Sequence, residues 1–262
     1  MEIWDPVTTT RKVVAGEAMP DGKTLVELNL PVGGSAFVVF APIEGNGEWG
    51  TGNGRPVLKK PSQQIPVTNA WNVSFAYHRG ISAAPPAPVT METLRDWTSF
   101  GEDGKAASTE LRYFSGAATY RTTLTLLHSS TPPPLHSSTR TLSLGELPTG
   151  LAHVFVNGKD CGVVWCAPWE ADVTSALREG ENEIEIRYTN NWFNRLVGDC
   201  FLKPEERVTR STVRYSAVPR ARTDPNRPWL MLPTIYSGPA VSDPLQPSGL
   251  IGPVILKLCN NK

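Results

Sequence analysis

Three tryptophans near the middle of this 262-residue sequence are its best candidates for a binding surface. Their flat rings can stack on the C–H faces of sugars, which is the contact that a carbohydrate-binding surface needs. Large aromatic rings also fill β-sandwich cores and domain interfaces. Core packing, interface packing and sugar contact are therefore alternative roles for each ring, and core packing is the favoured one. The three are Trp165, Trp169 and Trp192.

A polar cluster follows Trp192 within residues 190–199. Asn194, Arg195 and Asp199 lie close together in the sequence there. A carboxylate can fix the orientation of a guanidinium group through two parallel hydrogen bonds. We favour an internal Arg195–Asp199 brace that holds a loop. The alternative is a loop that docks on, or rims, the active site of an adjacent domain.

Glu170 and Asp172 are closely spaced acidic residues beside the candidate tryptophans. Cleavage of a glycosidic bond ordinarily needs two carboxyl groups about 5–9.5 Å apart across the sugar. In a turn, these two acids would most often cap backbone N–H groups, and sugar contact is the alternative. The sequence shows no Gly-x-Ser-x-Gly elbow, phosphate loop or dinucleotide fingerprint. It therefore identifies no catalytic residue.

Composition narrows the choice of partners. Lys+Arg and Asp+Glu both number 25, so the formal net charge is zero and neither nucleic acid nor an anionic membrane is expected as a partner. No apolar run approaches the roughly 20 residues of a membrane helix, and no signal peptide is visible at the start. The four cysteines and four histidines are scattered, so we expect no metal site and four free thiols. A Cys161–Cys166 bridge is the alternative.

Short apolar alternations between turn residues dominate the sequence, which has 24 prolines and 22 glycines. This pattern predicts an all-β sandwich or jelly roll. Asn157-Gly158 predicts a type I′ hairpin, because both central residues of that turn need positive φ. Residues 183–188 alternate strictly, as a strand does. Residues 90–97 are the one expected helix, and residues 180–182 are expected to form a tight turn.

Two regions are expected along the chain. Residues 1–64 should be a partial β domain that ends in a linker over residues 44–64, where Gly, Asn, Pro and Lys are frequent. Residues 35–40 are continuously apolar, which predicts a strand buried on both faces. Two or three strands cannot close a sandwich, so this region should pack on the rest of the chain or on another domain. Residues 65–262 should form the sandwich.

The order of elements over residues 110–190 resembles the galactose-binding-like jelly roll of glycoside hydrolases. The likeness continues through residues 113–120, through the pattern Asn-Trp-x-Asn-Arg-x-x-Gly-Asp at residues 191–199, and through residues 248–254. Trp4-Asp5-Pro6 and residues 35–40 extend it toward the start. Together these segments resemble the C-terminal region of α-L-rhamnosidases of glycoside hydrolase family 106 and related proteins.

The resemblance implies a galactose-binding-like jelly-roll β-sandwich preceded by a few strands of a second β domain. It also implies a catalytic barrel upstream that supplies the general acid and base, so this chain is expected to begin after the barrel. Its expected role is to brace the catalytic domain and to contact carbohydrate, such as a rhamnose-containing glycan. The alternatives are an independent carbohydrate-binding module and a glycoside hydrolase active on its own.

The resemblance also bears on cofactors and on location. Many galactose-binding-like domains carry a structural calcium ion, but this sequence shows no dense Asp/Asn cluster of the kind that calcium favours. We therefore expect no cofactor, and a structural calcium ion is the alternative. Parent proteins of such domains usually lie outside the cytoplasm.

Overall fold

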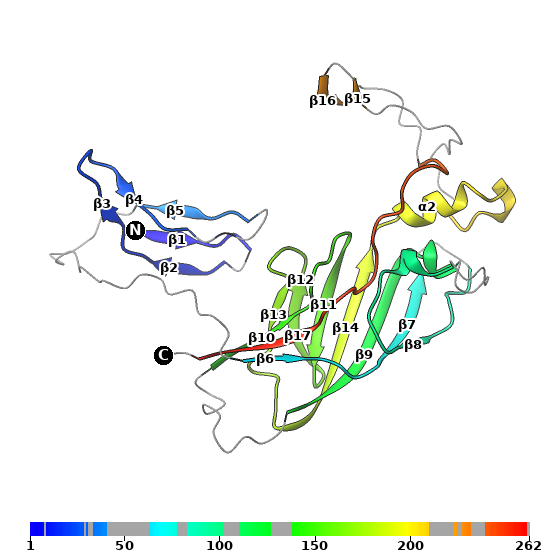
Figure 1. The fold of residues 1–262 in the computed structure, drawn as a ribbon, viewed down its shortest axis with the longest axis horizontal. Helices are drawn as coiled ribbons and strands as arrows, with labels where there is room; N and C mark the ends of the chain where they lie inside the picture. The colour runs from blue at the N-terminus through cyan, green and yellow to red at the C-terminus, as the bar shows by residue number, and fades with distance from the viewer. Residues whose placement is uncertain are drawn as a thin grey trace. The chain divides into compact units, whose positions relative to one another are not determined.

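The computed structural model describes residues 1–7, 9–28, 30, 34–40, 63–77, 83–101, 110–126, 138–209, 223–224, 227–231 and 239–260. The chain divides into two compact units, Met1–Ser62 and Gln63–Lys262, called here the N-terminal unit and the sandwich unit. Each unit has its own sheets (Figure 1). Most of the expected linker, residues 44–62, lies outside the described residues.

Two antiparallel sheets form the sandwich unit (Figure 1). One has six strands in the order β12-β11-β14-β9-β7-β8, and the other has four in the order β13-β10-β17-β6. The all-β sandwich predicted from the sequence is confirmed. In chain order the strands are β6 (Gln63–Pro66), β7 (Trp71–Tyr77), β8 (Val89–Met91), β9 (Gly116–Leu126), β10 (Ser138–Ser143), β11 (Gly150–Val156), β12 (Lys159–Val164), β13 (Glu170–Asp172), β14 (Gly180–Asn190) and β17 (Ile255–Asn260).

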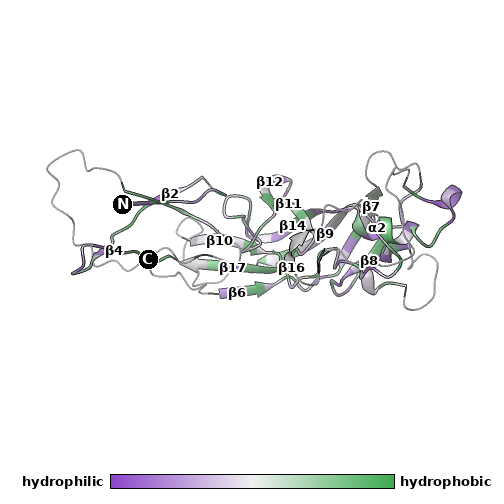
Figure 2. Cartoon of the chain, turned by 90° about the horizontal axis from the view of Figure 1, so that it is seen from above, coloured by the Kyte–Doolittle hydropathy of each residue, from purple (hydrophilic) through white to green (hydrophobic). Residues whose placement is uncertain are grey.

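The core of this unit receives alternate side chains from both sheets. On β14, Ile184, Ile186 and Tyr188 are buried while the residues between them are more exposed, as the alternation over residues 183–188 predicted. Leu142 and Leu256 face each other across the β10–β17 pair and are also buried. Burying one such side chain is worth about 1.5–3 kcal/mol, so these rows hold the sheets together. Figure 2 shows hydrophobic residues recurring along β17.

A second part of the core is aromatic. Trp97 is fully buried and donates its indole N–H to Tyr120 Oη over 2.8 Å. Gly249 passes beside this ring with a φ of 95°, and a Cβ there would lie 2.5 Å from Trp97 Nε1. Both the backbone conformation and the lack of space therefore require glycine at this position.

The hairpin between β11 and β12 has the predicted turn. Asn157 and Gly158 have φ of 51° and 75°, which is what a type I′ turn requires. The Asn157 side chain donates to Asn182 Oδ1 over 2.9 Å. Asn182 is fully buried and donates in turn to the Arg178 carbonyl oxygen over 2.8 Å. Residues 180–182 are the first three residues of strand β14. The prediction of a tight turn at these residues is therefore wrong.

The helix expected over residues 90–97 is also wrong. Thr90 lies in β8 opposite Asn72 of β7, and its hydroxyl donates to the Asn72 side chain over 3.1 Å. A single 3-10 turn, η1 (Trp97–Ser99), follows, and the Asp96 side chain accepts from Thr98 N at its start. Cross-strand pairing with β7 outweighs the weak capping signal of Thr90.

The N-terminal unit has five short strands. They are β1 (Glu2–Trp4), β2 (Arg11–Val13), β3 (Glu17–Ala18), β4 (Thr24–Leu25) and β5 (Phe37–Val39), in a β2-β1-β5 sheet and a β3-β4 hairpin. None of its described residues is buried. The strand expected to be buried on both faces is exposed at Phe37 and half-buried at Val38 and Val39, because no second sheet of this unit covers it among the described residues.

Three smaller observations complete the fold. A short hairpin joins β15 (Thr223–Asp224) to β16 (Arg227–Met231). Cys161, Cys166 and Cys200 are free, whereas the side chain of Cys259 lies outside the described residues. In the described part of the chain, no helix combines the length and apolar character needed to cross a bilayer.

Candidate functional site

The polar run after β14 forms a short helix, α2 (Phe193–Asp199), which the sequence did not predict. Asn191 starts it by accepting a hydrogen bond from Phe193 N over 3.0 Å. Just before it, the buried Asn190 side chain accepts from Gly116 N and donates to the Phe114 carbonyl, both over 2.9 Å. The end of β14 is thereby tied to the start of β9, and α2 lies beyond the ends of these strands (Figure 1).

Asn194 joins α2 to the segment that leads into the last strand. It is 1% exposed. Its amide donates to the Gln246 carbonyl oxygen over 2.7 Å and to Ser248 Oγ over 3.1 Å, and its oxygen accepts from Gln246 N over 2.8 Å. Both amide hydrogens and the amide oxygen of Asn194 are bonded inside the protein, and the side chain is buried, so Asn194 fixes a loop and is not exposed to a ligand.

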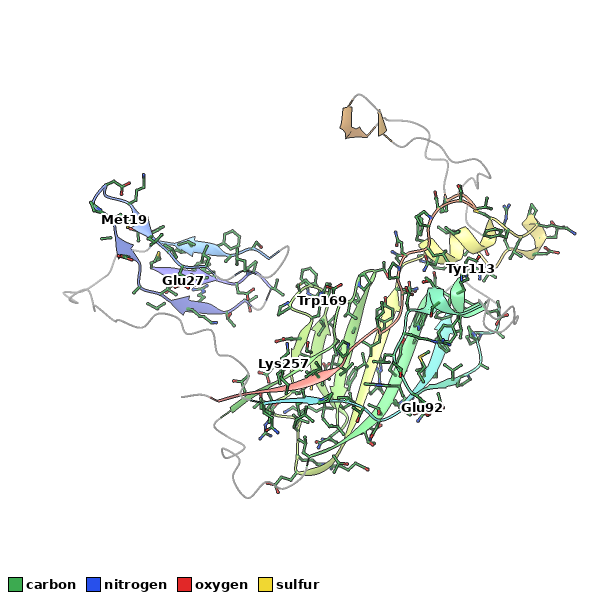
Figure 3. The ribbon with its side chains drawn as sticks, viewed as in Figure 1. Met19, Glu27, Glu92, Tyr113, Trp169 and Lys257 are labelled. Atoms are coloured by element: carbon green, nitrogen blue, oxygen red, sulfur yellow. The ribbon has the colours of Figure 1, made fainter. Side chains whose placement is uncertain are left out.

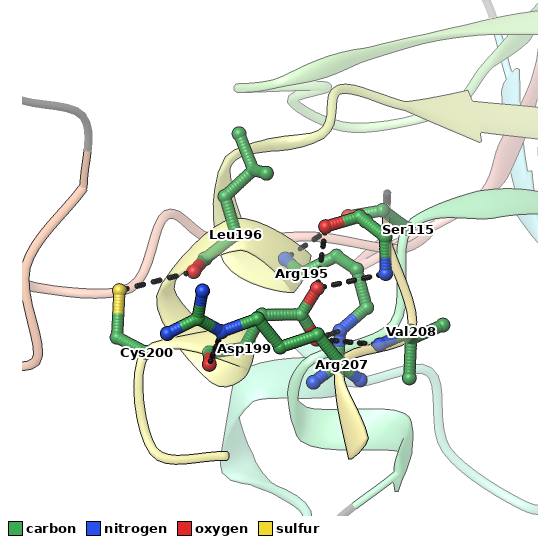
Figure 4. Close-up of polar contacts among 8 residues, drawn as sticks. Ser115, Arg195, Leu196, Asp199, Cys200, Arg207 and Val208 are labelled. Carbon is green, nitrogen blue, oxygen red and sulfur yellow. Dashed lines mark hydrogen bonds and ion pairs between the residues drawn. The ribbon is translucent and has the colours of Figure 1, made fainter. Parts of the chain in front are cut away.

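Arg195 and Asp199 form the internal brace that the sequence favoured (Figure 4). Arg195 Nε lies 3.0 Å from Asp199 Oδ1, and both side chains are buried. The Nε–H is not aimed at that oxygen, so the contact is an ion pair without a hydrogen bond. Asp199 also accepts from Val208 N over 3.3 Å and from Thr209 N over 2.8 Å. The Thr209 hydroxyl is a further donor to it.

The space around this ion pair is fully used. The Arg195 guanidinium carbon lies 5.9 Å from the centre of the Tyr113 ring, and Tyr113 is beside α2 (Figure 3). A Cβ on Gly198 would lie 2.5 Å from Arg195 Nη2 and 2.7 Å from Tyr113 Cβ. The glycine in the Asn-Trp-x-Asn-Arg-x-x-Gly-Asp pattern is therefore explained by packing of the arginine.

The three candidate tryptophans lie in three different environments. Trp169 is partly buried against the core, at the start of β13 (Figure 3). Trp192 precedes α2 and is 37% exposed, and Trp165 follows β12 and is 57% exposed. The structure therefore does not gather the candidates into one site. Trp165 has the most accessible ring, while the polar cluster is internal.

The paired acids near these tryptophans have structural partners. Glu170 Oε1 receives an ion pair and hydrogen bond from Lys257 Nζ of β17 over 2.6 Å. Asp172 accepts from Thr174 N over 2.9 Å, which is the backbone capping that was expected. In the described residues, no three Asp, Glu, His or Cys side chains come together, so this part of the chain offers no carboxylate-rich calcium site.

The partners of the polar cluster were missed in the sequence. Ser115 Oγ accepts from Arg195 N over 3.3 Å, and Thr209 and Ser248 complete the contacts of Asp199 and Asn194. Ser115 and Ser248 lie 80 and 54 residues from the α2 residues that they contact, and Thr209 lies 10 residues after Asp199. Serine and threonine in loops carry no local signal for such long-range contacts, so sequence spacing could not have found them.

Comparison with known proteins places the chain beside glycoside hydrolases. No protein-family profile matches it. The structure of a rhamnosidase from Novosphingobium sp. PP1Y covers 98% of this chain, at 27% identity and a TM-score of 0.60. A protein of Formosa agariphila named "Putative beta-glucuronidase" is 29% identical over 216 residues, which are 78% of this chain.

These matches define the class of fold and its extent. The chain has a glycoside hydrolase-like fold, because 98% of it aligns with part of a rhamnosidase structure at a TM-score of 0.60. It spans only 20% of that rhamnosidase and 16% of the Formosa agariphila protein.

Proposed function

We propose that this chain is a non-catalytic β-sandwich region of an α-L-rhamnosidase-like glycoside hydrolase of the family 106 type. In this role it braces a catalytic barrel domain and contacts carbohydrate. The observation that carries the proposal is the match over 98% of this chain to one fifth of a rhamnosidase. The activity of the longer protein would then lie largely in the other four fifths.

The N-terminal unit supports a docking role. Strand register puts six residues on one face of its sheet, called here the N-terminal face: the apolar Trp4, Val13, Phe37 and Val39 together with Glu2 and Arg11. Val13 is 82% exposed and Phe37 is 61% exposed. Large apolar side chains exposed together and rimmed by polar residues often mark an interaction surface. A small sheet with no buried residue of its own gains stability only when such a face is covered.

The acids support a non-catalytic role. Glu170 and Asp172 are committed to Lys257 and to a backbone N–H, as described above. Glu185 is held between two arginines. A glycosidase needs one carboxyl group that carries a proton and a second that faces it across the sugar. None of these three described acids is placed to do so.

A domain replacement in the Novosphingobium rhamnosidase tests the proposal. One version lacks the region that this chain matches, and a second carries this chain in its place. We expect the deletion to remove turnover of an aryl α-L-rhamnoside and the replacement to restore it, while this chain alone shows none. Turnover by the isolated chain would refute the non-catalytic role, and a fully active deletion would refute the bracing role.

Substitutions on the N-terminal face sharpen this test. Val13→Asp with Phe37→Asp should lower the thermal midpoint of the replacement protein, because two charges would enter a covered apolar contact. Lys12→Asp is the matched control, since Lys12 lies on the same strand but on the opposite face. Equal stability of the two versions would show that the N-terminal face is not a docking surface.

An independent carbohydrate-binding module is the second candidate function. The exposed ring of Trp165 favours it, because an aromatic platform for sugars must be open to solvent. This candidate predicts saturable binding of rhamnose-containing glycans by the isolated chain, weakened by Trp165→Ala.

A further inference from the structure

The outer face of the six-stranded sheet carries a group of side chains that the docking role does not use. Register places Phe155 opposite Glu185 and His153 opposite Arg187 in the β11–β14 pair. Directly paired residues of a sheet share a face. Because Ile184 and Ile186 point into the core, these four side chains point outward.

A small hollow opens on this face. It has a volume of about 160 Å³ and is lined by Phe155, Gly158, Glu183, Glu185 and Arg187. Pockets for drug-sized ligands usually hold roughly 300–1,000 Å³. The hollow is therefore large enough for a group the size of part of a sugar ring, and polar and apolar atoms line it in similar measure.

Glu185 and Arg187 are held in fixed positions at the hollow. Arg187 Nε donates to Glu185 Oε1 over 2.6 Å, and Arg121 Nε donates to Glu185 Oε2 over 2.8 Å. The Arg187 guanidinium carbon also lies 4.3 Å from the centre of the Phe155 ring. Among the described residues the hydrogen bonds of the Arg187 side chain use only Nε, which leaves its Nη groups as donors for a ligand. Preorganised donors and acceptors of this kind bind hydroxyl groups at low entropic cost.

Apolar side chains continue the same face toward the sheet edge. Val163 lies opposite His153, and Trp165 comes two residues later, beyond the end of β12. By continued alternation Trp165 falls opposite Leu151, on the outer face. Leu151, Val163 and Trp165 are 42%, 49% and 57% exposed. Four residues of β11, or roughly 13 Å, separate Leu151 from Phe155.

The charges on this face select the ligand. Glu183, Glu185 and Asp160 carry three carboxylates, against the two guanidinium groups of Arg121 and Arg187. A slightly acidic face disfavours an anionic ligand and favours a neutral one whose hydroxyl groups can donate to carboxylates. Because Trp165 is level with Leu151, it lies roughly 13 Å along the strand direction from the level of Phe155, a span that suits a chain of sugar rings better than a single ring.

We propose that this outer platform, formed by Leu151, Val163, Trp165, Phe155, Glu183, Glu185 and Arg187, binds a neutral oligosaccharide. Trp165 stacks on one sugar ring, and the hollow at Glu183, Glu185 and Arg187 receives hydroxyl groups of another. None of the residues of the platform belongs to α2 or to the N-terminal face.

The platform binds its ligand without cleaving it. Glu183 and Glu185 lie on one strand and point the same way, so they cannot face each other across a glycosidic bond. Burial raises the pKa of Glu185, but hydrogen bonds from Arg187 and Arg121 together outweigh it and hold the pKa below its usual value of 4.5. Glu185 is therefore ionised at neutral pH and holds no proton for a leaving group.

An NMR titration of the full chain tests the proposal. The neutral probes are cellotriose and a rhamnose-terminated trisaccharide, the acidic probe is trigalacturonate, and each is added to about 10 mM, above the millimolar affinity expected for an open site. We expect saturable shifts with at least one neutral probe and weaker binding of the acidic one. Trp165→Ala and Arg187→Ala should each weaken the binding about tenfold or more, a change in free energy typical of losing a central contact.

Arg95→Ala is the matched control. Arg95 also stacks on a phenylalanine, Phe100, at 3.8 Å, but outside the platform. It should leave the affinity unchanged. If Arg187→Ala fails to fold, Arg187→Lys serves instead, because it keeps the charge and loses the planar stack.

Three results would overturn the proposal. The first is the absence of a saturable shift with either neutral probe. The second is that the Arg95 and Arg187 variants weaken ligand binding equally, and the third is that trigalacturonate binds more tightly than the neutral probes. None of these bears on the domain replacement described above, so a failed platform and a failed bracing role can be told apart.

Discussion

Removing the charge of Asp199 should strongly destabilise the sandwich unit. Asp199 is 0% exposed and Arg195 is 5% exposed, so Asp199→Asn leaves a buried guanidinium without its counter-charge. Breaking a buried ion pair from one side costs about 3–5 kcal/mol. The asparagine oxygen can still accept from Thr209, so we expect a value near the lower end of that range. Total stabilities are about 5–15 kcal/mol, so this single change would remove a large part of the total.

The cost should fall when both charges are removed together. Arg195→Met leaves Asp199 with its donors at Val208 and Thr209, so it should cost less than Asp199→Asn. The double variant should be destabilised by about 1–3 kcal/mol less than the sum of the single ones, as is usual for residues in contact. Urea unfolding followed by tryptophan fluorescence measures this without adding salt that would screen the charges.

A matched ion pair in the same unit provides the control. Glu170 and Lys257 are 2.6 Å apart, with side chains 24% and 26% exposed. Glu170→Gln should cost about 1 kcal/mol or less, because solvent screens this pair. If the Asp199 and Arg195 changes are additive within about 0.5 kcal/mol, the two charges do not support each other. The brace assigned to this helix would then be wrong.

Three further predictions concern other parts of the sandwich unit. Gly249→Ala should cost about 1–3 kcal/mol more than Gly162→Ala in urea unfolding, because both glycines have φ near 94° but only at Gly249 would the Cβ meet the Trp97 ring; equal costs would refute the packing argument. Because the pKa of Glu185 is lowered, its carboxylate stabilises the folded state above pH 4.5, and this stabilisation is lost as the pH falls through the lowered pKa. Between pH 5 and 3 the unfolding midpoint of Glu185→Gln should therefore fall less than that of the parent protein. Burial raises the pKa of Tyr120 above 10, so its contribution to stability is complete below pH 10 and is lost as the pH rises further; its ionisation, followed by ultraviolet absorbance, should coincide with unfolding rather than precede it.

Local chemistry made parts of this fold predictable. The type I′ hairpin at Asn157-Gly158 follows from two residues that tolerate positive φ, and strand β14 follows from strict alternation. The errors occurred where a residue serves a distant partner. Thr90 looks like a helix cap, yet its hydroxyl bonds Asn72 of a neighbouring strand. Asn182 looks like a turn residue, yet it is buried and organises the corner before β14.

The same limit applies to the candidate site. An aspartate four residues after an arginine is a local signal, so the Arg195–Asp199 brace could be predicted. Its other partners could not, because Ser115 and Ser248 become neighbours of α2 only after the sheets have formed. The three tryptophans were grouped because they are close in sequence, but their exposed fractions show that they lie in different environments.

The outer platform shows why register decides function on a sheet face. Phe155 and Glu185 are 30 positions apart in the sequence, so no local pattern pairs them. The β11–β14 register makes them direct neighbours, and β9 then brings Arg121 to Glu185 from the other side. A shift of one residue would turn these side chains into the core and Ile184 and Ile186 outward. The buried row that stabilises the sandwich therefore also fixes the side chains that meet a ligand on its other face.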